Sequence, residues 1–309
     1  MKHEARVFLL LALTACLWGL SITLVRHLNL SFPATALAGI RSFIAGLFLF
    51  GVAWSSRSLT PVPPQGWRHI FMAALFLVYL QQMALSWGLR FTHAATAGII
   101  IGLEPVLTIL FAAWWLRERM SLINWLGVFL GFAGVCIIVL SDTEDSGFHG
   151  LRLGELITLG AVLSAAIGSM FVKKAVACAN AMTVTAYSFL IASGCFLLTM
   201  GVEWLIFPTQ DYPTQWLPWA LLLFTGIVSI GLCNLWWNYG IQQVGASRAS
   251  HFLNLIPVSS LLFSVWLLGE PASWWHLLAL VFILLGVTLG LRPVSIRTKS
   301  RPLHDSIQL

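Results

Sequence analysis

The chain has 309 residues, of which 59% are hydrophobic and 9% are charged, with a formal net charge of +6. Soluble domains carry about 25% charged residues, so a water-soluble globule is excluded. The mean hydropathy of +0.88, with recurring apolar runs long enough to cross a bilayer core of about 30 Å, indicates a polytopic all-α membrane protein.

Taken in chain order, the apolar runs predict ten membrane-spanning helices separated by short breaks with turn-forming or acidic residues. These helices are expected over residues 7–26, 33–54, 68–89, 96–116, 122–140, 154–172, 181–206, 216–240, 249–268 and 274–292. The first run resembles a lipoprotein signal ending in "LTAC", but it continues beyond Cys16 and is interpreted as a spanning helix. The five cysteines show no paired spacing, which favours packing residues over a disulfide or metal framework.

The basic residues predict how these helices are oriented. With a cytoplasmic amino terminus, most of the 17 lysines and arginines fall at cytoplasmic helix ends, and only Arg26, Arg90 and Arg152 fall on the other side. We therefore expect a bacterial inner-membrane protein with both termini in the cytoplasm, including a basic tail over residues 293–309. Membrane topology accounts for the positive charge, and no nucleic-acid partner is expected.

The sequence contains an internal repeat. Residues 93–140 align without gaps on residues 245–292, an offset of 152 residues. The most informative pairs are Pro105 with Pro257, Trp114 with Trp266, Glu118 with Glu270, and Gly134 with Gly286. Since each copy would contain five helices, an odd number, the copies are expected to insert in opposite orientations, as in secondary transporters. We expect one repeat within residues 1–141 and a second, inverted repeat within residues 150–292.

The repeated signature, together with "LWG" at residues 17–19, resembles the EamA domain of the drug/metabolite transporter superfamily. The resemblance covers essentially the whole chain as two copies. It implies ten transmembrane helices, a cavity between the halves, and export or exchange of small metabolites by alternating access. The sequence holds no convincing catalytic, nucleotide-binding or metal-binding motif, so we expect gradient-driven transport without a cofactor, and no enzyme activity.

Two ionisable residues, Arg41 and Glu104, lie deep inside predicted spans. A charge there costs about 2.5–3.5 kcal/mol on insertion scales, so both are candidates for function. Each lies about eight residues into helices of the same direction, at a depth that allows pairing. The pair could be a static ion pair that fixes packing, or Glu104 could be a substrate or proton site that Arg41 holds or releases. The repeat aligns them with Ser193 and Ile256, so only the first half carries the charges.

Other polar or aromatic residues within spans are candidates for the cavity wall. Trp18 lies far from either end of its span, unlike most tryptophans of the chain, and could either pack in the core or line a cavity and stack on a ligand. The remaining candidates are carboxamides: Gln82, Asn234, Asn238 and Asn254. Interhelical hydrogen bonds explain these carboxamides about as well as ligand contacts do. His251 could carry a coupling proton near neutral pH, with a packing role as the alternative.

The repeated residues are assigned to the scaffold. Pro105 and Pro257 are expected to bend their helices and free backbone carbonyls beside a cavity. Glu118 and Glu270 precede Ser121 and Ser273, which we expect to cap the fifth and tenth helices. Because the two glutamates would lie at opposite membrane faces, a structural or gating role is favoured over ligand binding.

The favoured function is a secondary transporter that exports or exchanges a small, amino-acid-like metabolite. A multidrug exporter of lipophilic cations is the alternative, since a carboxylate facing an aromatic cavity would suit such cargo. A membrane-embedded enzyme is disfavoured, because the predicted loops are short and poor in histidine. The expected partners are a small-molecule substrate and membrane lipids, with protons as a candidate coupling ion.

Overall fold

A computed structural model describes residues 2–115, 120–141, 153–206, 212–245, 248–249 and 251–290, and within these ranges it contains helices and no strands. In chain order the helices of the first half are α1 (Lys2–Leu28), α2 (Ala34–Ser55), α3 (Pro64–Ala73), η1 (Ala74–Leu80), α4 (Gln81–Phe91), α5 (Ala94–Ile101), α6 (Glu104–Trp115) and α7 (Leu122–Ser141). Those of the second half are α8 (Leu153–Val176), α9 (Ala181–Ile206), α10 (Trp216–Phe224), η2 (Thr225–Leu232), α11 (Cys233–Val244), η3 (His251–Asn254), α13 (Leu255–Leu268) and α14 (Trp274–Gly290).

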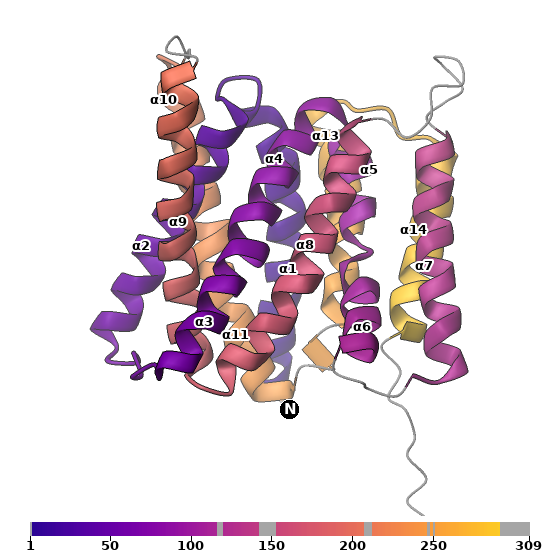
Figure 1. The fold of residues 1–309 in the computed structure, drawn as a ribbon. Coiled ribbons are helices and arrows are strands. Elements are labelled where there is room, and N and C mark those ends of the chain that lie inside the picture. The colour runs from indigo at the N-terminus through magenta and orange to yellow at the C-terminus, as the bar shows by residue number, and fades with distance from the viewer. Residues whose placement is uncertain are drawn as a thin grey trace, which may run out of the picture.

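The helices form a bundle suited to a bilayer. Figure 1 shows them side by side with roughly parallel axes. The described residues include eight apolar helical stretches long enough to cross a membrane and two shorter ones, Leu122–Ile138 and Trp274–Leu289. Large apolar side chains point outward from the middle of helices, such as Phe129 at 69% and Leu198 at 74% exposure. Such surfaces are unfavourable in water and favourable in lipid, so the predicted class of polytopic all-α membrane protein is confirmed.

The two ends of the bundle carry different chain segments. α1 begins and α14 ends at the same end, the lower one in Figure 1, which we call the terminal face. The other end, the distal face, holds the end of α1, the start of α5 and the turn between α13 and α14. The acidic residues between the fifth and sixth predicted helices and the predicted tail over 293–309 lie outside the described residues.

Two of the long stretches contain a π-helical segment in their middle, which the sequence did not predict. These are η1, between α3 and α4, and η2, between α10 and α11. The repeat offset carries residues 74–80 onto residues 226–232, so the two segments occupy matching positions. A π-helical turn leaves an apolar run uninterrupted, which explains why the hydropathy pattern predicted plain helices. Such segments are rare and often occur at functional sites.

The stretch predicted as one helix over 96–116 is two helices. α5 ends at Ile101, Gly102 and Leu103 form a turn, and α6 begins at Glu104. At the matching place in the second half, the 3-10 turn η3 leads into α13. The repeat therefore places an irregular helix junction before the shared proline in both halves.

The prediction that Pro105 and Pro257 bend continuous helices is wrong, because each proline lies in the first turn of its helix. Pro105 is the second residue of α6 and Pro257 the third residue of α13. In a first helical turn the missing N–H of proline costs no hydrogen bond, so both prolines begin helices rather than bend them. Pro105 still provides no N–H for the carbonyl of Ile101, four residues earlier.

α7 and α14 pack closely through matching small residues. A Cβ added at Gly134 would lie 2.9 Å from the Ala279 carbonyl oxygen, and one at Gly286 would lie 2.8 Å from that of Gly127. The offset carries Gly127 onto Ala279 and Gly134 onto Gly286, so the contact is reciprocal. Helix backbones approach this closely only where no large side chain intervenes.

Candidate substrate site

Glu104 lies directly after the break between α5 and α6. Its side chain is half-buried, and among the described residues its carboxylate has no hydrogen bond or ion pair. The neighbouring carbonyl of Ile101 lacks its usual helical donor because Pro105 has no N–H. A carboxylate and a freed carbonyl at one point of an apolar stretch form a polar spot that a cation, a proton or a hydrogen-bond donor would stabilise.

Arg41 is held by hydroxyl groups. Its side chain lies on α2 and is 2% exposed. Nε donates to Thr225 Oγ1 at 3.1 Å, and Nη2 donates to Ser21 Oγ at 3.0 Å. Nη1 has no hydrogen-bond partner among the described residues. These hydroxyls join α1, α2 and the first residue of η2 around one buried cation.

The predicted ion pair between Arg41 and Glu104 is absent: within the described part of the chain neither residue forms an ion pair. α2 packs mainly against α9 and η2, whereas α6 packs mainly against α8. Equal depth in the membrane therefore did not imply adjacency. Ser21 and Thr225, which replace the carboxylate, gave little sequence signal because single hydroxyls are common in apolar helices.

Trp18 contacts α11 through an aromatic pair. Its ring centroid lies 5.3 Å from that of Trp237, with the planes tilted by 55°. Both rings are half-buried. Next to Trp18, a Cβ added at Gly19 would lie 2.8 Å from the Ile256 carbonyl oxygen of α13. The small residue thus lets α1 approach α13, next to the contact of Trp18 with α11.

The two asparagines of α11 are engaged by protein groups. Asn234 Nδ2 donates to the Ile230 carbonyl at 2.7 Å, within the π segment that precedes it. Asn238 Nδ2 lies 3.5 Å from Thr185 Oγ1 of α9, at the limit of a hydrogen bond. For these two residues the geometry supports the interhelical and local bonding considered from the sequence.

Gln82 and Asn254 have free polar groups. Gln82, the second residue of α4, is half-buried and has no hydrogen bond within the described residues. Asn254 ends η3, and its Oδ1 is buried with no partner in the same part of the chain. A buried polar atom without a partner costs about 1–3 kcal/mol, which makes Asn254 a better ligand candidate than the α11 asparagines. Gln82 is a candidate because its carboxamide is not engaged by any described residue.

The predicted residues sort into two groups by the helices that carry them. Gln82 on α4 and Glu104 on α6 belong to helices that both pack against α8. Trp18 on α1 belongs to a helix that packs against α11 and α13. His251 begins η3 and is exposed, while Glu118 lies outside the described residues.

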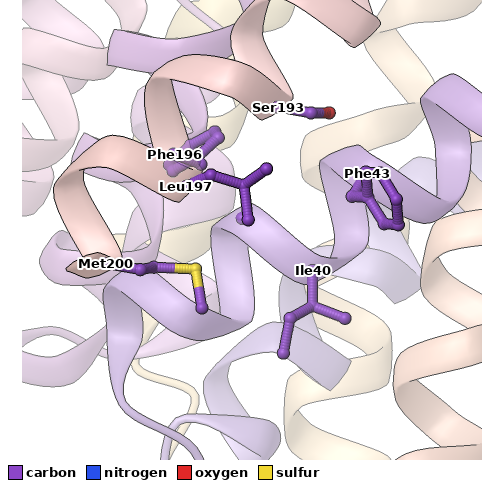
Figure 2. Close-up of a pocket in the computed structure, with 7 residues that line it drawn as sticks. Ile40, Phe43, Ser193, Phe196, Leu197 and Met200 are labelled. Carbon is purple, nitrogen blue, oxygen red and sulfur yellow. The ribbon is translucent and has the colours of Figure 1, made fainter. Parts of the chain in front are cut away.

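A well-defined hollow lies elsewhere, between α2 and α9. Figure 2 shows Ile40 and Phe43 of α2 beside Phe196, Leu197 and Met200 of α9. Its volume of about 60 Å³ is far below the roughly 300–1,000 Å³ of ligand pockets. Because Phe43 is 42% and Leu197 61% exposed, the hollow belongs to the apolar outer surface. It is a packing gap and no substrate site.

The serines expected to cap two helices do so. Ser121 Oγ accepts from Asn124 N at 3.2 Å before α7, and Ser273 Oγ accepts from Trp275 N at 3.3 Å before α14. Glu270 lies in the turn before Ser273, and its carboxylate reaches the first backbone N–H groups of α5. Sequence reasoning missed this contact, because it joins segments more than 170 residues apart.

Comparison with known proteins identifies the family. The sequence profile of the EamA-like transporter family matches residues 6–140 and, a second time, residues 152–292. The chain belongs to the EamA-like transporter family. The sequence resemblance to EamA domains is thereby confirmed, and the chain is a membrane transporter of this family rather than an enzyme.

Relatives of this EamA-like chain are known along its full length. It is 29% identical over 303 residues to the uncharacterized transporter YvbV of Bacillus subtilis (strain 168), covering 96% of this chain and 93% of that protein. It is 27% identical over 291 residues to an uncharacterized transporter of Archaeoglobus fulgidus, covering 92% and 98%. A crystal structure with 18% sequence identity superposes with a TM-score of 0.62 over 91% of this chain and 94% of that one, which supports the helical fold.

Proposed function

We propose that the chain is a secondary transporter that exports or exchanges a small, amino-acid-like metabolite by alternating access. Its ten spanning helices form two inverted five-helix repeats, over residues 1–141 and 150–292. We place the protein in a bacterial inner membrane with both termini in the cytoplasm, because most basic residues fall at the helix ends that this orientation makes cytoplasmic.

Matched irregular helices are the observation that carries the proposal. η1 and η2 occupy equivalent positions, and so do the α5–α6 break and the junction of η3 with α13. Interrupted apolar helices at corresponding places of two halves are characteristic of transporter binding sites. Such backbone is stable in a membrane only where it is buried in protein or faces a water-filled path.

Glu104 is the group that cargo meets in this proposal. Its carboxylate has no partner among the described residues, so the ammonium group of an amino-acid-like substrate, or a proton, would stabilise it. Gln82 supplies a free carboxamide from a helix that, like α6, packs against α8. Asn254 supplies a second one at the matching junction of the other half. The proposed site is thus acidic and rich in hydrogen-bonding groups.

The multidrug alternative rests on a different observation. The half-buried Trp18–Trp237 pair offers aromatic faces, which attract lipophilic cations. A flat hydrophobic cation would then combine this pair with the charge of Glu104. The two candidates differ in the cargo that competes for transport, and one experiment separates them.

The test is exchange in proteoliposomes. Purified protein is reconstituted, vesicles are loaded with a pooled metabolite mixture, and the compounds that leave are measured by mass spectrometry. Protein-free vesicles are the control. Specific, mutually competing efflux of one or a few zwitterionic metabolites is the expected result. Efflux of lipophilic cations alone would favour the alternative, and no efflux of either class with an imposed proton gradient would contradict the proposal.

A further inference from the structure

The carboxylate of Glu270 joins the two halves at the distal face. Oε1 accepts from the backbone N–H of Ala94 at 3.0 Å, and Oε2 accepts from that of Ala95 at 3.1 Å. These are the first two residues of α5, and Glu270 is 8% exposed. A carboxylate at a helix N-terminus forms charge-assisted hydrogen bonds with otherwise unpaired donors.

Arg26 and His93 lie beside the same carboxylate. Arg26 Nε lies 3.9 Å and His93 Nδ1 lies 3.6 Å from Oε1 of Glu270. Arg26 Nη1 also donates to the carbonyl oxygens of Leu89 at 2.8 Å and Arg90 at 3.3 Å. The end of α1, the end of α4 and the start of α5 are thereby tied to the α13–α14 turn.

Further hydrogen bonds join the helices at the distal face around Glu270. Ser260 Oγ of α13 donates to the Ala94 carbonyl at 3.0 Å, and Asn29 Nδ2 donates to the Ser86 carbonyl at 2.7 Å. A Cβ added at Gly98 of α5 would overlap the side chain of Ser260. α5 and α13 therefore pack closely through the small side chain of Ser260. In this structure the distal face is closed by these contacts between α5, α13 and the α13–α14 turn.

We propose that Glu270 is the latch of a gate at the distal face, which holds α5 of the first half against the α13–α14 turn of the second half and releases it when that face opens. This inference rests on the proposed alternating-access function. α5 ends at the break that precedes Glu104, so releasing its N-terminus frees the short helix to move while α6 stays packed on α8. Contacts between halves on one face must break when that face opens.

Several titratable or charged groups lie on the elements packed around the latch. They are Arg26 of α1, Arg90 of α4, His93 before α5, Glu155 of α8 and His276 of α14. Burial by itself would raise the pKa of Glu270, whereas hydrogen bonds from His93, Ala94 and Ala95 and the charge of His93 lower it. The lowering is the larger effect, so the pKa of Glu270 lies below its ordinary value. The latch is therefore an ionised carboxylate at neutral pH.

The test is hydrogen–deuterium exchange of full-length protein in lipid nanodiscs, comparing wild type with Glu270→Gln. A glutamine keeps the size of the side chain but has one oxygen for two N–H donors and no charge. The expected result is faster exchange at residues 86–101 and 264–276, coupled to slower exchange at residues 238–254 of the terminal face. A shift of about tenfold in the ratio of closed to open distal face is expected from the loss of one charge-assisted contact.

Glu203→Gln is the matched control, since it removes one acid near the distal end of α9 that contacts neither α5 nor the turn. Exchange that rises only in the first turn of α5 would show a simple helix cap and overturn the gate, and so would no change at all. Glu270→Asp, which keeps the charge but shortens the reach, should give a smaller coupled shift. The exchange measurement needs no substrate, so it is independent of the transport assay. If the wild type transports but Glu270→Gln leaves hydrogen–deuterium exchange unchanged, the gate is refuted while the proposed transport function stands.

Discussion

Glu104 and Glu270 are two acids of one chain in opposite surroundings. Glu270 has two backbone N–H donors, the Arg26 guanidinium and the His93 ring within 4 Å, whereas Glu104 has no ion pair or hydrogen bond to any described residue. A carboxylate that is fully partnered stabilises the arrangement of helices that partners it. A carboxylate without protein partners is stabilised by a cation, a proton or a hydrogen-bond donor that binds to it. The first suits a latch and the second suits a site for cargo.

Replacing Glu104 should have the largest effect on transport. We expect Glu104→Gln to lower exchange in proteoliposomes by about 10- to 100-fold, because cargo loses a charge-assisted contact of about 1.5–3 kcal/mol. The thermal midpoint in detergent should not fall, since no described residue loses a bond. Glu203→Gln controls for the change in net charge. Normal exchange by a folded Glu104→Gln protein would contradict the role of Glu104.

Replacing Arg41 should act on stability. Arg41→Gln removes the bonds to Ser21 and Thr225, and we expect the free energy of unfolding to fall by about 1.5–3 kcal/mol. Because Arg41 and Glu104 do not touch in the described structure, the Arg41→Gln and Glu104→Gln effects should add within about 0.5 kcal/mol. Thermal unfolding of both single variants and the double variant measures this. Stronger coupling would mean that the two charges meet in another state of the transport cycle.

The latch at Glu270 should depend on pH in one direction. The pKa of Glu270 in the closed state lies below its ordinary value of 4.5, so the ionised form stabilises the closed distal face. That stabilisation is complete above about pH 4.5 and disappears as the pH falls through the lowered pKa. Distances between spin labels across the distal face should therefore stay constant from pH 7 to pH 5 and lengthen at lower pH. Glu270→Gln should show no such step, and a step at neutral pH would assign the switch to another group.

Asn254 should give the smallest effect. Its Oδ1 is buried without a partner among the described residues, so Asn254→Ala should leave the thermal midpoint unchanged. If Asn254 contacts cargo, the KM for exchange should rise roughly three- to tenfold, as for loss of one hydrogen bond of about 1 kcal/mol. Asn234→Ala is the comparison, because Asn234 bonds to its own helix and should affect KM less. Equal KM values for wild type and Asn254→Ala would remove Asn254 from the site.

The sequence predicted the features that depend on composition along the chain. Apolar runs gave helix positions close to those observed, and the offset of 152 residues paired Gly134 with Gly286, which occupy matching places in the α7–α14 contact. The π segments and the break before Glu104 were missed, because they change backbone hydrogen bonding without changing hydropathy. The partners of Arg41 were missed because depth in a span does not tell which helices are neighbours, and those of Glu270 because they lie more than 170 residues away along the chain.

The central claim is that cargo meets the chain at the helix break before Glu104. The most direct measurement is hydrogen–deuterium exchange of the wild type in nanodiscs, with and without the metabolite that the exchange screen identifies. The account predicts slower exchange at residues 99–108 when that metabolite is present, and no such protection in Glu104→Gln. Protection confined to another part of the chain, or equal protection of both proteins at residues 99–108, would contradict it.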